Sequence, residues 1–182
     1  MKYVIIIIFL FSSLKVVSQT SLDSLLFEKI NNYRITNGLN EIFWDSNVYN
    51  ASNHHSKYLK ILNADSLKTI ISHSEKIDVN NFDELLSVYD RFDKYIGKKY
   101  KYISENIAST LKKENFPIDN LVDIIFNQWK MSIKHNEILL NPYMKFGACS
   151  IIISTKEFYS SSKEYKKKIL MQKSFATLNV FY

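Results

Sequence analysis

Two stretches near the end of the chain most constrain its fold. Residues 146–153 (FGACSIII) and 175–182 (FATLNVFY) carry apolar side chains at both odd and even positions. Since alternate side chains of a strand point to opposite faces, each stretch predicts a strand buried on both faces. Such a strand needs a layer of structure on each side. The polar and charged residues 154–173 between them predict a long exposed connection.

Upstream of these strands, apolar residues recur at helical spacing. The expected helices cover residues 21–37, 45–62, 80–97 and 117–131, and after a break at 132–134 a further short helix runs from His135 to Asn141–Pro142. Helices that precede strands indicate an α+β domain rather than a wound parallel sheet. We expect an α-β-α sandwich, with a small antiparallel sheet between helical layers. Trp44 and Trp129 are both expected to be buried, and so is His55, with its ring hydrogen-bonded.

The first 18 residues have the pattern of a signal peptide. Lys2 is followed by an apolar run from Tyr3 to Phe11, and Ser18 offers a small residue before a cut. The run is shorter than the roughly 20 apolar residues that span a membrane. We therefore expect a signal peptide over 1–18, one domain over 19–182, and a secreted or periplasmic protein. An uncleaved anchor is the alternative.

Charge and cysteine content narrow the classes of partner. Cys149 is the only cysteine, so an intramolecular disulfide is excluded. The formal net charge of +6 falls to +4 without Lys2 and Lys15. Lysines cluster at 94–101 and 163–173, without the aromatic pattern of a nucleic-acid-binding surface. We expect a monomer with a solvated basic surface, no nucleic-acid partner, and a possible contact with a membrane surface or the cell envelope.

Several short motifs occur along the chain: N-Y-R at 32–34, G-L at 38–39, F-W at 43–44, S-E-N-I-A at 104–108, W-K-M-S at 129–132, H-N at 135–136, I-L-L-N-P at 138–142 and F-G at 146–147. Together they resemble the CAP superfamily of cysteine-rich secretory proteins, antigen 5 and plant pathogenesis-related 1 proteins, in its bacterial, SCP-like form. They occur in the family's order from about Leu25 to the C-terminus. Their joint order and spacing make the resemblance specific.

The resemblance implies a cleft with two histidines and one or two acids. By motif, His73 and His135 are the histidines, and these two are the expected ligands of any divalent metal such as zinc. Glu105 is the first acid and is followed by Asn106, while Ser132 occupies the position where many eukaryotic members carry a second glutamate. We therefore expect a ligand cleft formed by His73, Glu105, Asn106, Ser132 and His135.

The residues leave the function open between two classes that use the cleft, and a third reading is a structural or protein-interaction role in which the cleft is vestigial. Two imidazoles and one carboxylate match the ligand set of a catalytic zinc site, but hydrolysis needs another general base, and Glu105 could instead fix the tautomer of a histidine. Cys149 is expected to be buried and inert. The first hypothesis is a binding module whose cleft takes a metal, peptide, lipid or glycan. The alternative is a metal-dependent hydrolase that uses the same cleft, and catalytic residues remain unassigned.

Overall fold

The computed structural model describes residues 21–65, 68–77, 79, 82, 84–113, 116–159 and 168–182. The predicted signal peptide lies outside these residues. The helices are α1 (Leu22–Thr36), α2 (Ser46–Leu62), α3 (Val88–Ile96), α4 (Asp119–Met131) and α5 (Ile133–Leu139). The strands are β1 (Phe43–Trp44), β2 (Ile103–Lys113), β3 (Phe146–Tyr159) and β4 (Lys168–Phe181).

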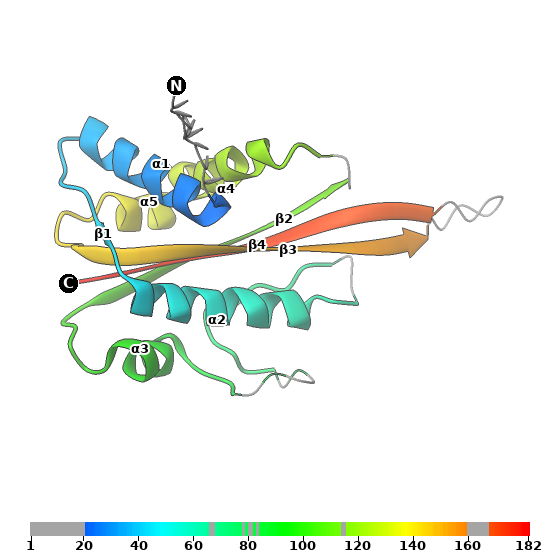
Figure 1. Ribbon diagram of the computed structural model, residues 1–182, viewed down its shortest axis with the longest axis horizontal. Coiled ribbons are helices and arrows are strands. Elements are labelled where there is room, and N and C mark those ends of the chain that lie inside the picture. The colour runs from blue at the N-terminus through cyan, green and yellow to red at the C-terminus, as the bar shows by residue number, and fades with distance from the viewer. Residues whose placement is uncertain are drawn as a thin grey trace, which may run out of the picture.

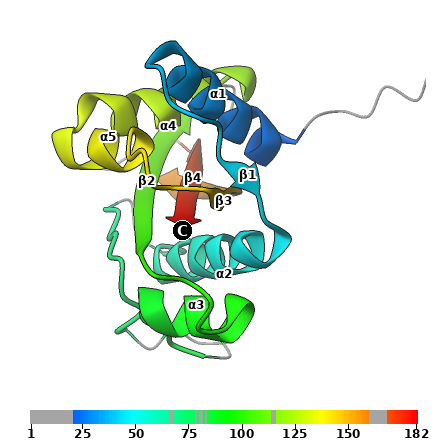
Figure 2. The ribbon, with the colours of Figure 1, turned by 90° about the vertical axis from the view of Figure 1, so that its left-hand side faces the viewer.

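The elements stack in three layers, as the sequence predicted (Figures 1 and 2). The strands form one sheet in the order β1-β3-β4-β2. Helices α1, α4 and α5 cover one face of this sheet, and α2 and α3 lie on the other (Figure 2). The sheet is mixed rather than purely antiparallel, because the two residues of β1 pair parallel with β3. Strand β2 pairs only with β4, so its other edge is free of a strand among the described residues.

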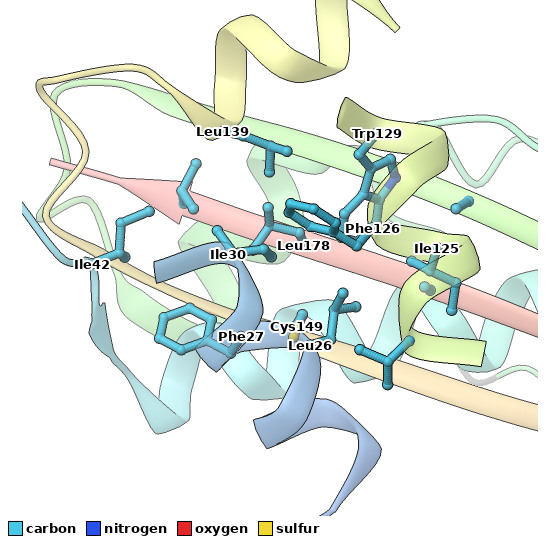
Figure 3. Packing of buried hydrophobic residues seen from close by; sticks show 14 of the residues in the cluster. Leu26, Phe27, Ile30, Ile42, Ile125, Phe126, Trp129, Leu139, Cys149 and Leu178 are labelled. Atoms are coloured by element: carbon cyan, nitrogen blue, oxygen red, sulfur yellow. The ribbon is translucent and has the colours of Figure 1, made fainter. Parts of the chain in front are cut away.

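The face under α1 and α4 is apolar (Figure 3). Trp129 is fully buried there, as predicted, and the thiol of Cys149 is buried beside it in the same cluster. The cluster is built mainly from Leu26, Phe27, Ile30, Ile125, Phe126, Trp129, Leu139, Cys149, Ala176 and Leu178. Burial of this much apolar surface is the main force that holds the helices on the sheet.

Several local expectations need correction. Trp44 is 40% exposed rather than buried, because it sits on the short edge strand β1 and packs edge-on against Phe27 at a ring distance of 5.1 Å. Within the segment 154–173, residues 154–159 and 168–173 are strand, since β3 and β4 stay in register out to Tyr159 and Lys168. Cross-strand pairing holds these residues extended although many of their side chains are polar.

Two helix boundaries also differ from the prediction. The third helix begins at Val88 rather than near residue 80, because Ser87 and Asp90 form a reciprocal capping box that fixes its first turn. The break between α4 and α5 is a single residue, Ser132, whose extended backbone (φ −91°, ψ 121°) separates the two helices. His135 therefore lies in the first turn of α5 rather than at its start.

Candidate functional site

The candidate site is built around the free edge of β2. Adjacent residues of a strand project to opposite faces, and the Glu105–Asn106 pair of β2 uses this property. The carboxylate of Glu105 contacts groups from the α2–α3 side of the sheet. The amide of Asn106 contacts α5 on the other side, donating from Nδ2 to the backbone oxygen of His135 at 3.0 Å. The motif thus links both helical layers at one edge.

His73 meets Glu105 directly. Its Nδ1 lies 3.0 Å from Glu105 Oε1, and its side chain is 49% exposed. A carboxylate can only accept, so Nδ1 carries a proton, and in the neutral form of the ring the lone pair is on Nε2. The second oxygen of Glu105 accepts from Arg91 Nη2 at 2.7 Å. Glu105 is therefore held between a guanidinium and an imidazole, and it orients His73.

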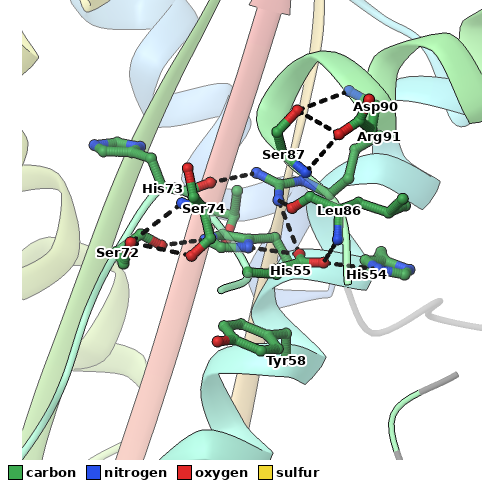
Figure 4. A network of polar contacts seen from close by, with 12 residues as sticks. His54, His55, Tyr58, Ser72, His73, Ser74, Leu86, Ser87, Asp90 and Arg91 are labelled. Atoms are coloured by element: carbon green, nitrogen blue, oxygen red, sulfur yellow. Dashed lines mark hydrogen bonds and ion pairs between the residues drawn. The ribbon is translucent and has the colours of Figure 1, made fainter. Parts of the chain in front are cut away.

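A second buried carboxylate, Glu75, shares Arg91 with Glu105, and Figure 4 labels Arg91 within this network of polar contacts. Arg91 Nη1 donates to Glu75 Oε1 at 2.8 Å, so one fully buried guanidinium bridges both acids. Glu75 also accepts the backbone N–H of Leu86 at 2.8 Å. This bond holds residue 86 in a non-helical conformation just before the cap of α3.

The two carboxylates are stabilised as anions. Burial alone raises the pKa of Glu75, but hydrogen bonds from His54 and His55 and the charge of Arg91 together lower it to about 2. Burial likewise opposes ionisation of Glu105, yet the Arg91 charge and the His73 hydrogen bond bring its pKa below the usual value. Both groups are therefore ionised at neutral pH.

His55 completes this buried cluster and is hydrogen-bonded, as predicted. Its Nδ1 lies 2.8 Å from Glu75 Oε1, and its Nε2 lies 2.9 Å from the backbone oxygen of Ser72. Both partners are acceptors only, so both bonds form only when the ring carries two protons. His55 and Arg91 thus both contact the anions Glu75 and Glu105, with His55 Nε2 4.0 Å from Glu105 Oε1.

The α5 side of the site supplies His135. Its ring is partly buried, and this burial, followed by the nearby charge of His73, lowers its pKa below 6.5. The backbone oxygen of His135 accepts from Asn106, which places residue 135 beside the strand that also carries Glu105. His135 is therefore a neutral imidazole at pH 7, which is the form that binds metals.

Two buried side chains fix α4 and α5 against the rest of the molecule. Trp129 donates from Nε1 to the backbone oxygen of Ile107 at 3.1 Å, which attaches α4 to the free edge of β2. Arg34 of α1 donates from Nη1 to the backbone oxygens of Leu139 and Asn141, at 2.7 and 2.9 Å. A guanidinium at the C-terminus of α5 satisfies carbonyls that the helix leaves unpaired. Arg34, from the N-Y-R motif, thus helps to position His135.

The donor set favours two protein ligands rather than three. Among the described residues, no group of three or more His, Cys, Asp or Glu side chains is arranged to hold a metal ion. Glu105 is occupied by Arg91 and His73, so it is an orienting group for His73 and not a third ligand. Ser132 separates α4 from α5, and its side chain makes no capping hydrogen bond. The remaining candidate ligands are His73 and His135.

The fold thus brings His73 and Glu105 into contact, with His135 and Asn106 joined to them across β2. Sequence reasoning missed the groups that support them, Glu75 and Arg91. One signal was present, because the chain has only two arginines, Arg34 and Arg91, against 22 lysines. Both arginines are fully buried. An arginine used so sparingly indicates a position that needs the planar, multi-donor guanidinium.

Comparison with known proteins agrees with the fold described above. The cysteine-rich secretory protein family model (CAP) matches residues 27–166. An extracellular SCP-domain protein from Bacillus anthracis is similar in structure, with a TM-score of 0.55 and 20% identity over 88% of this chain. A cysteine-rich secretory protein from Staphylococcus aureus has a TM-score of 0.49 and 16% identity over 91% of this chain. This chain covers 40% of each of those two proteins.

An outer surface protein from Borrelia burgdorferi has a TM-score of 0.46 and 18% identity, over 86% of this chain and 90% of its own length. None of the curated proteins compared with the sequence matches it. Within the described residues, no helix is long and apolar enough to cross a membrane. At these low identities the similarity in structure concerns the fold alone. The function of the site is therefore argued from its own residues.

Proposed function

Because the chain belongs to the cysteine-rich secretory protein (CAP) family, we propose that it is an exported binding module whose cleft holds a divalent metal through His73 and His135. The observation that carries the proposal is the contact between Glu105 and His73 Nδ1 at 3.0 Å. A carboxylate on one ring nitrogen fixes the tautomer and raises the basicity of the other nitrogen toward a metal. His73 is thereby prepared as a ligand through Nε2.

His135 supports the same proposal. Its lowered pKa keeps it free of a competing proton at neutral pH. Two imidazoles suit zinc and other late first-row divalent ions. With two protein ligands, a bound ion would keep positions for water or for a donor group of a peptide, lipid or glycan. Such an ion would supply Lewis acidity and a coordination point for that ligand.

Binding is favoured over hydrolysis by the state of Glu105. A general base works best when its pKa lies near the working pH. Glu105 has a pKa below its usual value and both oxygens occupied by Arg91 and His73. Ser132, at the position of the family's second acid, cannot act as a carboxylate base. The hydrolase remains the second candidate, and turnover on a panel of peptides and esters with zinc present would establish it.

Calorimetry of zinc binding tests the proposal. We expect wild-type protein to bind zinc at pH 7.5 and to lose affinity as the pH drops through roughly 6.5 and below, because only neutral imidazole ligates. The double variant His73→Ala/His135→Ala should fold and lose binding. Glu105→Gln should weaken binding about 10- to 100-fold, the usual effect of removing a group that orients a ligand.

His54→Ala is the matched control, because both ring nitrogens of His54 are already hydrogen-bonded, to Tyr95 and to Glu75. It should bind zinc within about twofold of wild type, since it supplies no free lone pair to a metal. Unchanged zinc affinity in the double variant would show that His73 and His135 do not form the site.

Export is a separate part of the proposal. It rests on the sequence pattern of residues 1–18 and on the extracellular and outer-surface descriptions of similar structures. Mass spectrometry of protein recovered from outside the cytoplasm should find a chain that starts at or near Gln19. Recovery of the chain with Met1 still attached would favour the uncleaved anchor.

A further inference from the structure

Helix α2 uses two different faces. The first is the sheet-facing stripe, with Val48, Ala51, His55 and Leu59 buried as expected of a packed helix. The second stripe, at 50, 53, 54, 57, 60 and 61, also recurs at helical spacing. It lines a partly open cavity of about 540 Å³, to which Tyr95 of α3 and Phe82 also contribute. This volume lies in the range of small-ligand sites, roughly 300–1,000 Å³.

The cavity is cationic. Lys57 and Lys60 lie one turn apart on its wall, and both residues are exposed. Within the described part of the chain, neither ammonium group has a carboxylate within 4.0 Å, and the lining contains no acid. Two uncompensated cations in a partly enclosed site attract an anion.

The cavity also presents an oriented polar wall. His54 Nε2 lies 3.1 Å from Glu75 Oε2, and His54 Nδ1 lies 3.1 Å from the hydroxyl of Tyr95. Since Glu75 is a carboxylate, Nε2 donates to it, and a ring with a single proton accepts from the Tyr95 hydroxyl at Nδ1. The phenol oxygen of Tyr95 therefore has lone pairs left to accept from a ligand hydroxyl. The amides of Asn50 and Asn53 add groups that both donate and accept.

An aromatic ring completes the lining. Phe82 packs edge-on against His54 at a ring distance of 4.8 Å, which gives the cavity an apolar wall beside its polar groups. The lining thus offers a phenol oxygen that can accept from a ligand hydroxyl, together with amides, two ammonium groups and an aromatic ring. These groups match a ligand with many hydroxyls, an apolar ring face and a negative charge. We propose that this cavity is a second ligand site, specific for an anionic sugar, and independent of the metal proposed for the cleft.

An NMR titration in the presence of a metal chelator tests the proposal without involving the cleft metal. The probes are glucuronate and glucose 6-phosphate, with glucose and inorganic phosphate as controls. We expect at least one of the two anionic sugars to bind at least about tenfold more tightly than either control, with amide shifts on α2 and α3. The comparison between glucuronate and glucose 6-phosphate identifies the preferred anionic group.

Matched variants test the residues. Lys57→Gln/Lys60→Gln should weaken the anionic sugar at least about tenfold and leave glucose unchanged. Lys98→Gln/Lys99→Gln removes the same charge from exposed positions outside the cavity and should leave affinity unchanged. Equal affinity for glucose would show that charge is not used, and equal affinity for phosphate would show that the sugar ring is not used. Either result, or shifts confined to other elements, would overturn the proposal.

Discussion

The two faces of the central sheet are held by different chemistry. On the α1–α4 face, side chains such as Ile125 and Leu178 are fully buried without polar partners to satisfy. On the α2–α3 face, the side chains of Thr177 and Asn179 from β4 are equally buried but polar. They meet hydroxyls of α2, with Asn179 Nδ2 3.0 Å from Ser52 Oγ and Thr177 Oγ1 2.9 Å from Ser56 Oγ.

This difference matters because the two kinds of contact respond differently to change. An apolar contact depends on volume and tolerates rearrangement, whereas a buried charge requires its partner in a defined place. The polar face includes the cluster of His55, Glu75, Arg91 and Glu105, which holds His73 at the edge of the sheet. We infer that the apolar face supplies most of the stability and the polar face supplies the geometry of the candidate site.

Substitution of Arg91 is the strongest test of the difference between the two faces of the sheet. Arg91→Leu leaves two buried carboxylates without their shared cation. Removing one partner of a buried ion pair typically costs about 3–5 kcal/mol, and we expect the upper end of this range or beyond. Urea unfolding at pH 7 measures the loss. Arg91→Lys should also be destabilised, because a single ammonium cannot donate to both Glu75 and Glu105 as the planar guanidinium does.

Lys94→Met on the same helix is the control. Lys94 and Glu84 form an exposed ion pair, and such pairs contribute about 0–1 kcal/mol. If Arg91→Leu cost no more than Lys94→Met, the buried cluster would not be the organising feature of that face.

The apolar face is tested by Trp129→Ala. Truncation of a fully buried aromatic costs about 3–5 kcal/mol, and this change also leaves the backbone oxygen of Ile107 without its indole donor. Trp44→Ala is the matched control and should cost clearly less, because Trp44 is 40% exposed. Urea unfolding decides between them. A loss below about 1 kcal/mol for Trp129→Ala, the range of surface positions, would contradict its assigned role.

The apolar face was the easier of the two to predict from sequence. Helical periodicity located α1 and α4 of this face, and also α2 of the other face, to within a few residues, and the two-sided strands required a layer on each side. The motif S-E-N-I-A indicated Glu105 and Asn106. Trp44 was misplaced because an apolar side chain on a two-residue edge strand has only one neighbouring strand to cover it.

The polar face resisted prediction for a physical reason. Periodicity reports burial of apolar residues, but a buried ion has no such pattern and depends on a partner distant in sequence. Glu75 and Arg91 are 16 residues apart, and Glu105 lies 14 residues further. Nothing local to Glu75 distinguishes it from a surface acid. The N-terminal start of α3 was missed for the same reason, since Glu75 holds the backbone of Leu86 out of the helix.

The pH dependence of stability is a further test of the difference between the two faces. The pKa of Glu75 is about 2 in the folded chain, against an ordinary value of 4.5. A depressed carboxyl pKa contributes stability that is fully present above 4.5 and is lost as the pH falls through about 2. A shift of this size corresponds to about 3 kcal/mol. Wild-type protein should therefore lose stability between pH 5 and pH 2, and Glu105, whose pKa is also lowered, adds to the same trend.

Glu75→Gln isolates the contribution of this residue. The variant should be less stable than wild type at pH 7, yet its free energy of unfolding should fall by about 3 kcal/mol less between pH 5 and pH 2, because it has lost the titrating group. Trp129→Ala should keep the wild-type slope, since the indole itself has no carboxyl that titrates. Urea unfolding across the pH series measures both slopes, and ¹³C NMR titration of the Glu75 carboxyl in the wild-type protein checks its pKa directly. If Glu75→Gln and wild type showed the same slope, the acid sensitivity of the fold would come from outside the buried cluster, and the division of roles between the two faces would fail.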